Sequence, residues 1–67
     1  MPNQPPSRKL YTQAFGDRVR MLRQSKTKLS QEALSAKIGV HRTFISRVER
    51  GETNITLVNI VRICAIL

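Results

Sequence analysis

The chain has 67 residues, which is enough for one small domain with a thin hydrophobic core. Twelve lysines and arginines face four acidic residues, and the formal charge of +8 favours a polyanionic partner, either nucleic acid or an anionic membrane surface. The single cysteine excludes an internal disulfide, and no apolar run reaches the length of about 18 residues that a membrane span needs. We therefore expect a cytoplasmic protein.

Residues 1–9 (MPNQPPSRK) are polar, weakly basic and rich in proline. They have no apolar face to pack against a core, and the prolines would interrupt the apolar centre of a signal peptide. We therefore predict a flexible leader, followed by one domain over residues 10–67.

A first helix is expected to begin between residues 10 and 13 and to end near Ser25. Its apolar side chains recur at helical spacing and would face the core: Phe15, Val19 and Leu22. Gly16 lies inside this helix and costs about 1 kcal/mol relative to alanine, so the first turn is predicted to fray. A polar connection then leads to Leu29, which returns to the core.

Two short helices joined by a tight turn are predicted in the segment from Gln31 to Gly51, QEALSAKIGVHRTFISRVERG. Ser30 is a good N-cap for the first of them, and Gly39 can adopt the left-handed backbone that ends it. Ser35 is small enough to let the two helices cross closely. The apolar positions fit a buried stripe along both helices: Leu34, Ile38, Val40, Phe44, Ile45 and Val48. This is the pattern of a helix-turn-helix.

The second of these helices is predicted to carry a polar, basic outer face. At about 100° per residue, the side opposite the apolar stripe holds Arg42, Thr43, Ser46 and Arg50, with Arg47 at its margin. Arginine can hydrogen-bond guanine O6 and N7 together, and threonine can contact a thymine methyl group, so this composition suits the DNA major groove. Such a face taken alone is more often solvated charge, and it is the preceding helix and turn that favour DNA contact.

A further helix is predicted over residues 57 to about 67, with Thr56 as its N-cap. The side chains expected in the core are Leu57, Ile60, Val61, Cys64 and, at the margin, Leu67. Cys64 would then act as a small apolar core residue. An exposed apolar surface, of the kind that marks an interface, would be formed by Ile63, Ile66 and Leu67.

The segment LSQEALSAKIGV, followed by RTFISRVERG, resembles the DNA-binding domain of the phage-repressor and Cro-like family, also called the Xre family. The resemblance covers the chain from about Phe15 to Leu67. It implies an all-α, compact lambda-repressor-like domain of four to five helices, in which the second and third form the helix-turn-helix and the third enters the major groove. Members of the family commonly carry a fifth helix, and many dimerise through it or through the end of the fourth.

The resemblance also implies roles for individual residues. Base edges would be read by Arg42, Thr43, Ser46 and Arg47, of which the two arginines are the stronger candidates. The DNA backbone would be held by Ser30, Gln31, His41, Arg50, Thr53 and Asn54, although Ser30 and Gln31 could equally serve only to cap their helix. His41 stands where the family usually has a serine or threonine cap, so it is expected to make either a local hydrogen bond or a contact at the groove's edge. Arg23 and Glu49 would form an ion pair that ties the first helix to the third.

The leading interpretation is a sequence-specific transcriptional regulator that binds a near-palindromic double-stranded DNA operator as a homodimer. The segment ERGETNITLVNI resembles the restriction–modification controllers within the family. The alternative is an antitoxin-type module that binds a partner toxin as well as DNA. A cationic membrane-surface peptide fits less well, because the basic residues surround a turn motif instead of lining one long amphipathic helix.

Catalysis and cofactor binding are not expected of this chain. The sequence contains no Ser/His/Asp set, no paired carboxylates and no glycine-rich phosphate loop. One histidine and one cysteine are too few ligands for a metal site, and no cofactor or small-molecule ligand is evident.

Overall fold

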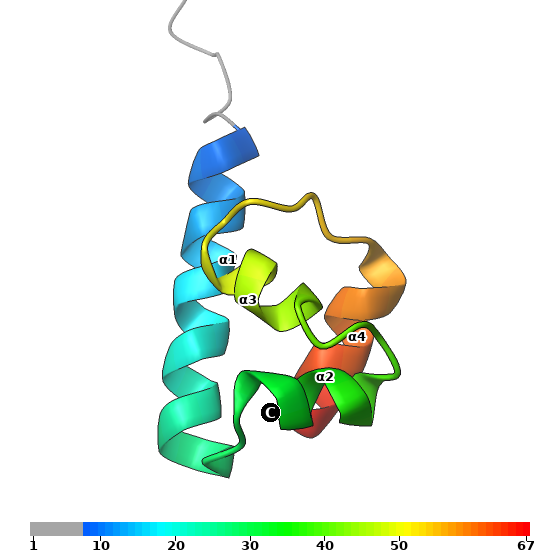
Figure 1. Cartoon of the computed structure of the whole chain (residues 1–67). Coiled ribbons are helices and arrows are strands. Elements are labelled where there is room, and N and C mark those ends of the chain that lie inside the picture. Colours follow the sequence, from blue (N-terminus) through cyan, green and yellow to red (C-terminus); the bar gives the residue numbers. More distant parts are fainter. Residues whose placement is uncertain (1–7) are drawn as a thin grey trace, which may run out of the picture.

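The structure is a computed structural model that describes the chain from Arg8 onward and its side chains from Leu10, so most of the predicted leader lies outside the described residues. Within this range the chain forms only helices, turns and loops. The elements, in order, are α1 (Arg8–Leu22), the π-helical turn η1 (Arg23–Thr27), α2 (Gln31–Ile38), α3 (Phe44–Glu49) and α4 (Leu57–Ile66) (Figure 1). The all-α architecture predicted from the sequence is confirmed. Over the described part of the chain, no helix has the length and apolar character needed to cross a membrane.

The first helix is longer than predicted at both ends. It begins at Arg8, before the expected boundary at residue 10, and continues into η1, which ends at Thr27 instead of near Ser25. The helical path stops there because Lys28 adopts a left-handed backbone with φ 58° and donates its amide N–H to the Arg23 carbonyl oxygen at 2.7 Å. The Thr27 hydroxyl donates to the same carbonyl oxygen at 2.9 Å.

α3 lies at the centre of the fold, packed against both α1 and α2, while α4 packs against α2 (Figure 1). Each α-helix contributes to one hydrophobic core, whose buried members are Val19, Leu34, Ile38, Ile45, Val48 and Ile63. Partly buried side chains pack around it, among them Phe15, Leu29, Val40 and Phe44. The apolar stripe predicted along the helix-turn-helix is therefore confirmed.

The bounds of α2 follow from the residues at its two ends. The Ser30 hydroxyl accepts a hydrogen bond from the Ala33 amide at 3.0 Å, which satisfies one of the free N–H groups at the helix start. At the other end Gly39 has φ 87°, and its amide donates to the Ser35 carbonyl oxygen at 2.9 Å. Both the cap and the left-handed glycine were predicted from the sequence, and both are present.

Ser35 connects α2 to the start of α3 in a way that its small size alone did not indicate. The side chain is completely buried. Its hydroxyl lies 3.4 Å from the Ile45 amide, from which it accepts, and 3.4 Å from the Arg42 carbonyl oxygen, to which it donates. One hydroxyl therefore joins two backbone groups at the entrance of α3 to the body of α2.

Gly16 lies where α1 crosses α3, and the prediction of a frayed first turn is wrong. The helix runs without interruption from Arg8, and Gly16 is buried within it. A Cβ atom at this position would overlap the Val48 carbonyl oxygen and lie 3.0 Å from the Glu49 carbonyl oxygen. The glycine therefore allows the two helix backbones to approach closely.

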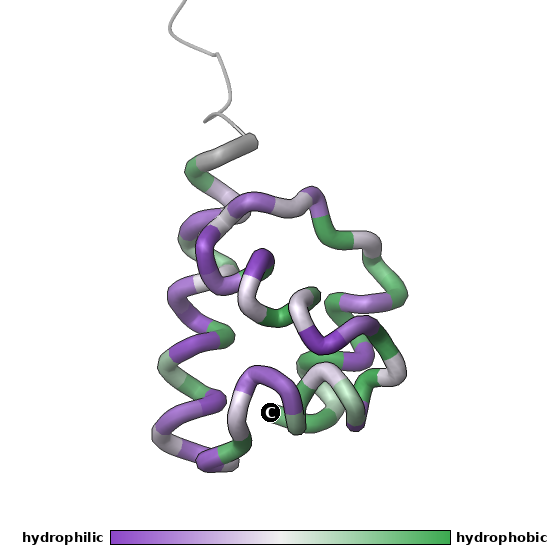
Figure 2. The backbone as a smooth tube through the Cα atoms, viewed as in Figure 1, coloured by the Kyte–Doolittle hydropathy of each residue, from purple (hydrophilic) through white to green (hydrophobic). Residues whose placement is uncertain are grey.

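The buried face of α4 differs from the prediction. Leu57, Val61 and Cys64, which were expected in the core, are exposed, and the Leu57 side chain is 75% accessible. Ile63, which was expected on the surface, is 1% accessible and belongs to the core. The reason is that α4 is apolar along most of its length (Figure 2) and its sequence, LVNIVRICAI, places apolar residues around most of the helix, so the pattern alone did not define which side faces inward.

Candidate nucleic-acid interface

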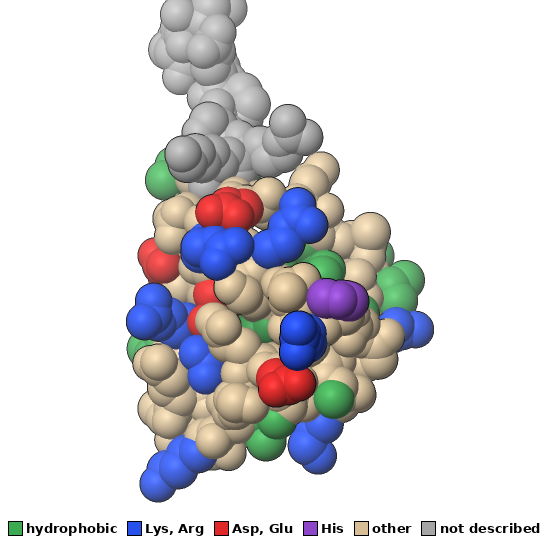
Figure 3. All heavy atoms as spheres, viewed as in Figure 1, with side chains coloured by type: hydrophobic (Ala, Val, Ile, Leu, Met, Phe, Trp, Pro, Cys, Tyr) green, Lys and Arg blue, Asp and Glu red, His purple; other side chains and the backbone are tan. Residues whose placement is uncertain are grey.

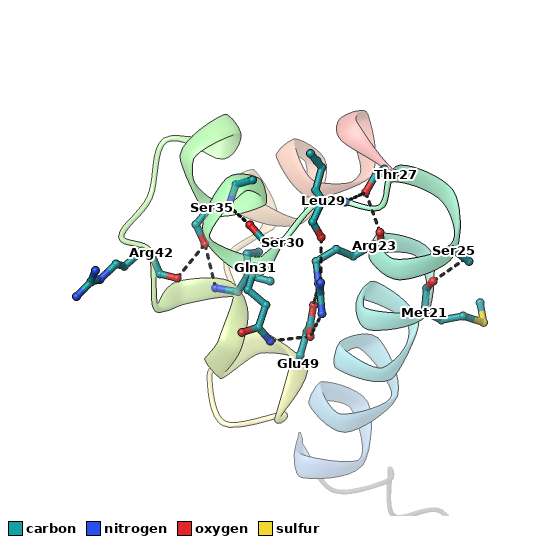
Figure 4. Close-up of polar contacts among 12 residues, drawn as sticks. Met21, Arg23, Ser25, Thr27, Leu29, Ser30, Gln31, Ser35, Arg42 and Glu49 are labelled. Atoms are coloured by element: carbon teal, nitrogen blue, oxygen red, sulfur yellow. Dashed lines mark hydrogen bonds and ion pairs between the residues drawn. The ribbon is translucent and has the colours of Figure 1, made fainter.

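The outward side of α3 and of the turn before it carries polar and basic side chains. The structure brings together there the four side chains predicted to read bases: Arg42, Thr43, Ser46 and Arg47. Ser46 is half-buried and the other three are exposed, whereas Ile45 and Val48 on the opposite side are in the core. In Figure 4 the Arg42 side chain points away from the body of the molecule, while its carbonyl oxygen faces Ser35.

On the surface around this side of α3 (Figure 3), basic side chains are more numerous than acidic ones. Figure 3 shows lysine and arginine side chains spread around the exposed His41, and acidic side chains lie beside some of them on the same face. Because exposed positive charges on one face attract a polyanion from a distance, this arrangement favours approach of a nucleic acid backbone.

His41 makes a local hydrogen bond in the turn before α3, which was one of the two expectations for it. Its Nδ1 atom accepts a hydrogen bond from the Thr43 amide at 3.2 Å and lies 2.9 Å from the Thr43 hydroxyl oxygen. Its carbonyl oxygen accepts from the Phe44 amide at 2.9 Å. The imidazole therefore does locally what a serine or threonine hydroxyl would do, and it also holds the Thr43 side chain.

Arg23 and Glu49 form the ion pair that the resemblance implied, and it is nearly enclosed. Arg23 Nε lies 2.6 Å from Glu49 Oε2, and the two side chains are 10% and 2% accessible. Arg23 Nη2 donates to Glu49 Oε1 at 3.1 Å, and Nη1 donates to the Leu29 carbonyl oxygen at 3.0 Å (Figure 4). The pair thus joins the end of α1 to the end of α3 and to the segment that precedes α2.

Gln31 completes this network, which the sequence did not indicate. Its side-chain Nε2 donates to Glu49 Oε1 at 2.9 Å, so one amide hydrogen of a predicted DNA-backbone contact is committed inside the protein. Ser30, at the exposed start of α2, uses its hydroxyl oxygen to cap the helix. The expectation of a helix cap is met by Ser30, whereas the printed contact of Gln31 goes to Glu49 and not to the start of α2.

Arg50 is held by its neighbours at the end of α3. Its Nε and Nη2 atoms donate to the two carboxylate oxygens of Glu52 at 2.9 and 3.1 Å, and Nη1 donates to the Ser46 hydroxyl oxygen at 2.8 Å. The hydrogen bond to Glu52 and the negative charge of the Glu52 carboxylate both raise the pKa of Arg50 above its ordinary value. The guanidinium is therefore charged at any physiological pH. The opposite charges of Arg50 and Glu52 on either side of a turn glycine were the available sequence signal for this contact.

The loop after α3 forms an open, polar groove together with α1. The groove is lined by Thr12, Gln13, Arg50, Gly51, Glu52, Thr53 and Asn54. The Thr12 hydroxyl donates to the Gly51 carbonyl oxygen at 3.1 Å, which attaches the loop to α1. The predicted backbone contacts Thr53 and Asn54 thus lie beside Arg50 at the end of the recognition face.

Comparison of the sequence with known proteins agrees with the helix-turn-helix seen in the structure. A family model described as helix-turn-helix matches residues 19–67, which include α2, α3 and α4 in full. The chain belongs to the helix-turn-helix family. Family membership confirms that the protein is a DNA-binding regulator of transcription and not an enzyme.

Two relatives of this helix-turn-helix chain are named control proteins. Control protein C.MunI from Mycoplasma sp is 45% identical over 51 residues, which are 76% of this chain and 69% of the relative. Control protein C.BamHI from Bacillus amyloliquefaciens is 49% identical over 49 residues, which are 73% of this chain and 60% of the relative. The chain therefore spans less than two thirds of the second relative. Both names favour the regulator over the antitoxin interpretation.

Proposed function

We propose that this chain is a sequence-specific regulator that reads a double-stranded DNA operator with the outward face of α3. The observation that supports this most directly is the division of α3 into two sides. Ile45 and Val48 are buried against α1 and α2, so the exposed side chains of Arg42 and Arg47 must face outward. A helix held in this way can enter the major groove without rearrangement of the domain.

Each of the four outward side chains has a chemical role that suits a base edge. Arg42 and Arg47 can each donate two parallel hydrogen bonds to guanine O6 and N7. Thr43, whose hydroxyl lies beside His41, can turn its methyl group toward a thymine methyl group. Ser46 can hydrogen-bond a base edge through its hydroxyl group.

The DNA backbone contacts that we propose surround this face on both sides. At the start of α2 are Ser30 and Gln31, where the free amides of the helix and the positive end of its dipole attract a phosphate. Before α3 stands the exposed His41, and after α3 come Arg50, Thr53 and Asn54. Gln31 retains a second amide hydrogen for this purpose besides the one that it donates to Glu49.

A homodimer on a near-palindromic operator is the assembly that we propose. The exposed side of α4 carries Leu57, Val58 and Val61, which are 75%, 59% and 59% accessible, with the exposed Cys64 one turn further along. Removing such an apolar face from water would favour pairing with the same face of a second copy. Two-fold symmetry would then set the recognition helices about 34–36 Å apart, on successive turns of the major groove.

We further propose that the chain acts as a control protein of the restriction–modification type, within the cytoplasm where an operator is accessible. This proposal rests on the resemblance of ERGETNITLVNI to such controllers and on the two relatives named control proteins. Its mechanism would be occupancy of a promoter, which blocks or assists the polymerase.

Selection of bound duplexes from a random DNA pool tests the proposed function. We expect enrichment of one sequence with two inverted half-sites about 10 base pairs apart from centre to centre, because a two-fold dimer presents two identical helices. Heparin serves as the control polyanion that carries charge but no base sequence. Failure to enrich any sequence, combined with binding to heparin as tight as to DNA, would contradict the proposal.

A further inference from the structure

Glu52 places a carboxylate beside the outward face of α3, close to where DNA phosphates would lie. It follows Gly51, whose left-handed backbone with φ 71° turns the chain back toward the helix. Both carboxylate oxygens accept hydrogen bonds from the Arg50 guanidinium, at 2.9 and 3.1 Å. The remaining guanidinium nitrogen, Nη1, donates to the Ser46 hydroxyl oxygen at 2.8 Å. The three side chains therefore form one line of hydrogen bonds from the loop to the recognition face.

The direction of these hydrogen bonds determines what Ser46 can offer to a base. A hydroxyl group has one donor hydrogen and two acceptor lone pairs, and its hydrogen rotates to suit the available partner. In this structure Arg50 occupies an oxygen lone pair, and its positive charge disfavours the approach of a second donor. The Ser46 hydroxyl group therefore offers its hydrogen, and not its oxygen, to a group outside the protein. It therefore suits base acceptors such as guanine O6 and N7 or thymine O4, and not the amino groups of cytosine and adenine.

We infer that Glu52 is a specificity-determining positioning residue, which holds Arg50 against Ser46 and so makes Ser46 a reader of base acceptors. While Glu52 holds the Arg50 guanidinium beside Ser46, Arg50 can contact only a phosphate that lies next to it there. The inference rests on the proposed function, because it requires the outward face of α3 to lie against base edges. The Arg50 and Glu52 side chains are 55% and 53% accessible, so solvent and salt screen the pair and it contributes little to the stability of the fold.

The test measures binding of the whole chain to two duplexes of equal length: the sequence that the wild-type chain selects from a random pool, and a random sequence. Glu52→Ala removes the acceptor, frees Arg50 and deletes one negative charge. We expect tighter binding to the random duplex and a log–log salt dependence steeper by up to about 0.9 per protomer, because Glu52 no longer neutralises the charge of Arg50. The ratio of selected to random affinity should fall about two- to tenfold per half-site, the effect of losing one neutral hydrogen bond.

Two variants separate positioning from charge. Asp17→Asn deletes one negative charge on α1, where Asp17 accepts a hydrogen bond from Gln13, and it should leave the affinity ratio unchanged. Glu52→Gln deletes the loop charge but keeps an acceptor oxygen for Arg50, so it should retain more base discrimination than Glu52→Ala.

In a Ser46→Ala background, Glu52→Ala should cause no further loss of base preference at the affected position, because both changes act on the same hydrogen bond.

Three results would overturn the inference. The first is a folded Glu52→Ala chain that keeps the wild-type affinity ratio and base preference. The second is equal loss of discrimination in Glu52→Gln and Glu52→Ala, which would assign the effect to charge alone. The third is unfolding of Glu52→Ala, since the exposed pair is expected to contribute little to the fold. Failure of the proposed function is distinct, because the wild-type chain would then bind the selected and random duplexes equally.

Discussion

A close approach between α1 and α3 depends on one residue without a side chain, Gly16. Gly16 is buried in the contact, and a Cβ atom there would overlap the Val48 carbonyl oxygen. A helical pattern in a sequence reveals the cost of a glycine, but it does not reveal which neighbouring backbone crosses at that position. The role of Gly16 therefore emerged only from the arrangement of the helices.

Substitution of Gly16 by alanine should destabilise the domain, although alanine is the better helix former by about 1 kcal/mol. Because backbone must move to accommodate the methyl group, we expect a net loss of about 1–3 kcal/mol in the free energy of unfolding. Urea denaturation followed by far-ultraviolet circular dichroism measures it. Ala14→Gly, at an exposed position of α1, is the control for propensity alone. A stabilised Gly16→Ala chain would contradict the close approach of the two helices.

Arg23→Ala should be among the most damaging single changes in the chain. It leaves the buried Glu49 carboxylate without its cation, with Gln31 as a neutral neighbour, and a buried pair broken on one side costs about 3–5 kcal/mol. For a domain of this size, such a loss should leave much of the chain unfolded at room temperature. Thermal unfolding of Arg23→Ala and of Arg20→Ala, which changes an exposed arginine of α1, provides the comparison. Equal midpoints for the two variants would show that the ion pair does not hold the helices together.

Among the elements, α2 was predicted correctly in its bounds and its buried side, whereas α4 was predicted correctly only in its bounds. α2 is bounded by a serine and a glycine whose backbone and side-chain chemistry define helix ends, and both act as predicted. α4 has the correct bounds, because Thr56 caps it through the Asn59 amide at 3.3 Å. Its buried side was assigned wrongly, since LVNIVRICAI places apolar residues around most of the helix and only the packing against α2 selects Ile63.

At the start of α3, His41 makes the local hydrogen bond that was one of the two expectations for it. Capping preferences place histidine below serine and threonine, yet the His41 imidazole reaches the Thr43 amide with Nδ1 at 3.2 Å. The four outward residues of this element were predicted correctly as exposed or half-exposed, because helical periodicity needs only one anchored apolar side. Their contacts with DNA remain predictions, as do those of the residues proposed at the backbone.

The observed side of α4 can be tested with two substitutions in the same helix. Ile63→Ala removes a side chain from the core and should cost about 2–5 kcal/mol in unfolding free energy. Val61→Ala changes an exposed position and should alter stability by less than about 0.5 kcal/mol in the monomer. Denaturation at low protein concentration gives both values. A larger loss for Val61→Ala than for Ile63→Ala would restore the side predicted from the sequence.

At the scale of the whole molecule, the excess of positive charge should dominate the strength of DNA binding. The formal charge is +8, and basic side chains surround the recognition face (Figure 3). If a dimer makes about 6–10 phosphate contacts, its affinity should fall by about 10³–10⁵ between 50 and 200 mM salt. Fluorescence anisotropy with a labelled duplex measures this slope. A nearly flat dependence on salt would exclude phosphate neutralisation as the main source of affinity.

The most direct test of the central claim compares wild-type, Arg42→Ala and Arg47→Ala chains on the selected duplex and on all of its single-base-pair variants. If α3 reads bases through these arginines, each alanine substitution should cost about 1–3 kcal/mol on the selected duplex and abolish the preference at one position per half-site, leaving the others intact. A loss of affinity that is uniform across all duplexes would instead place both arginines on the DNA backbone and contradict recognition by this face.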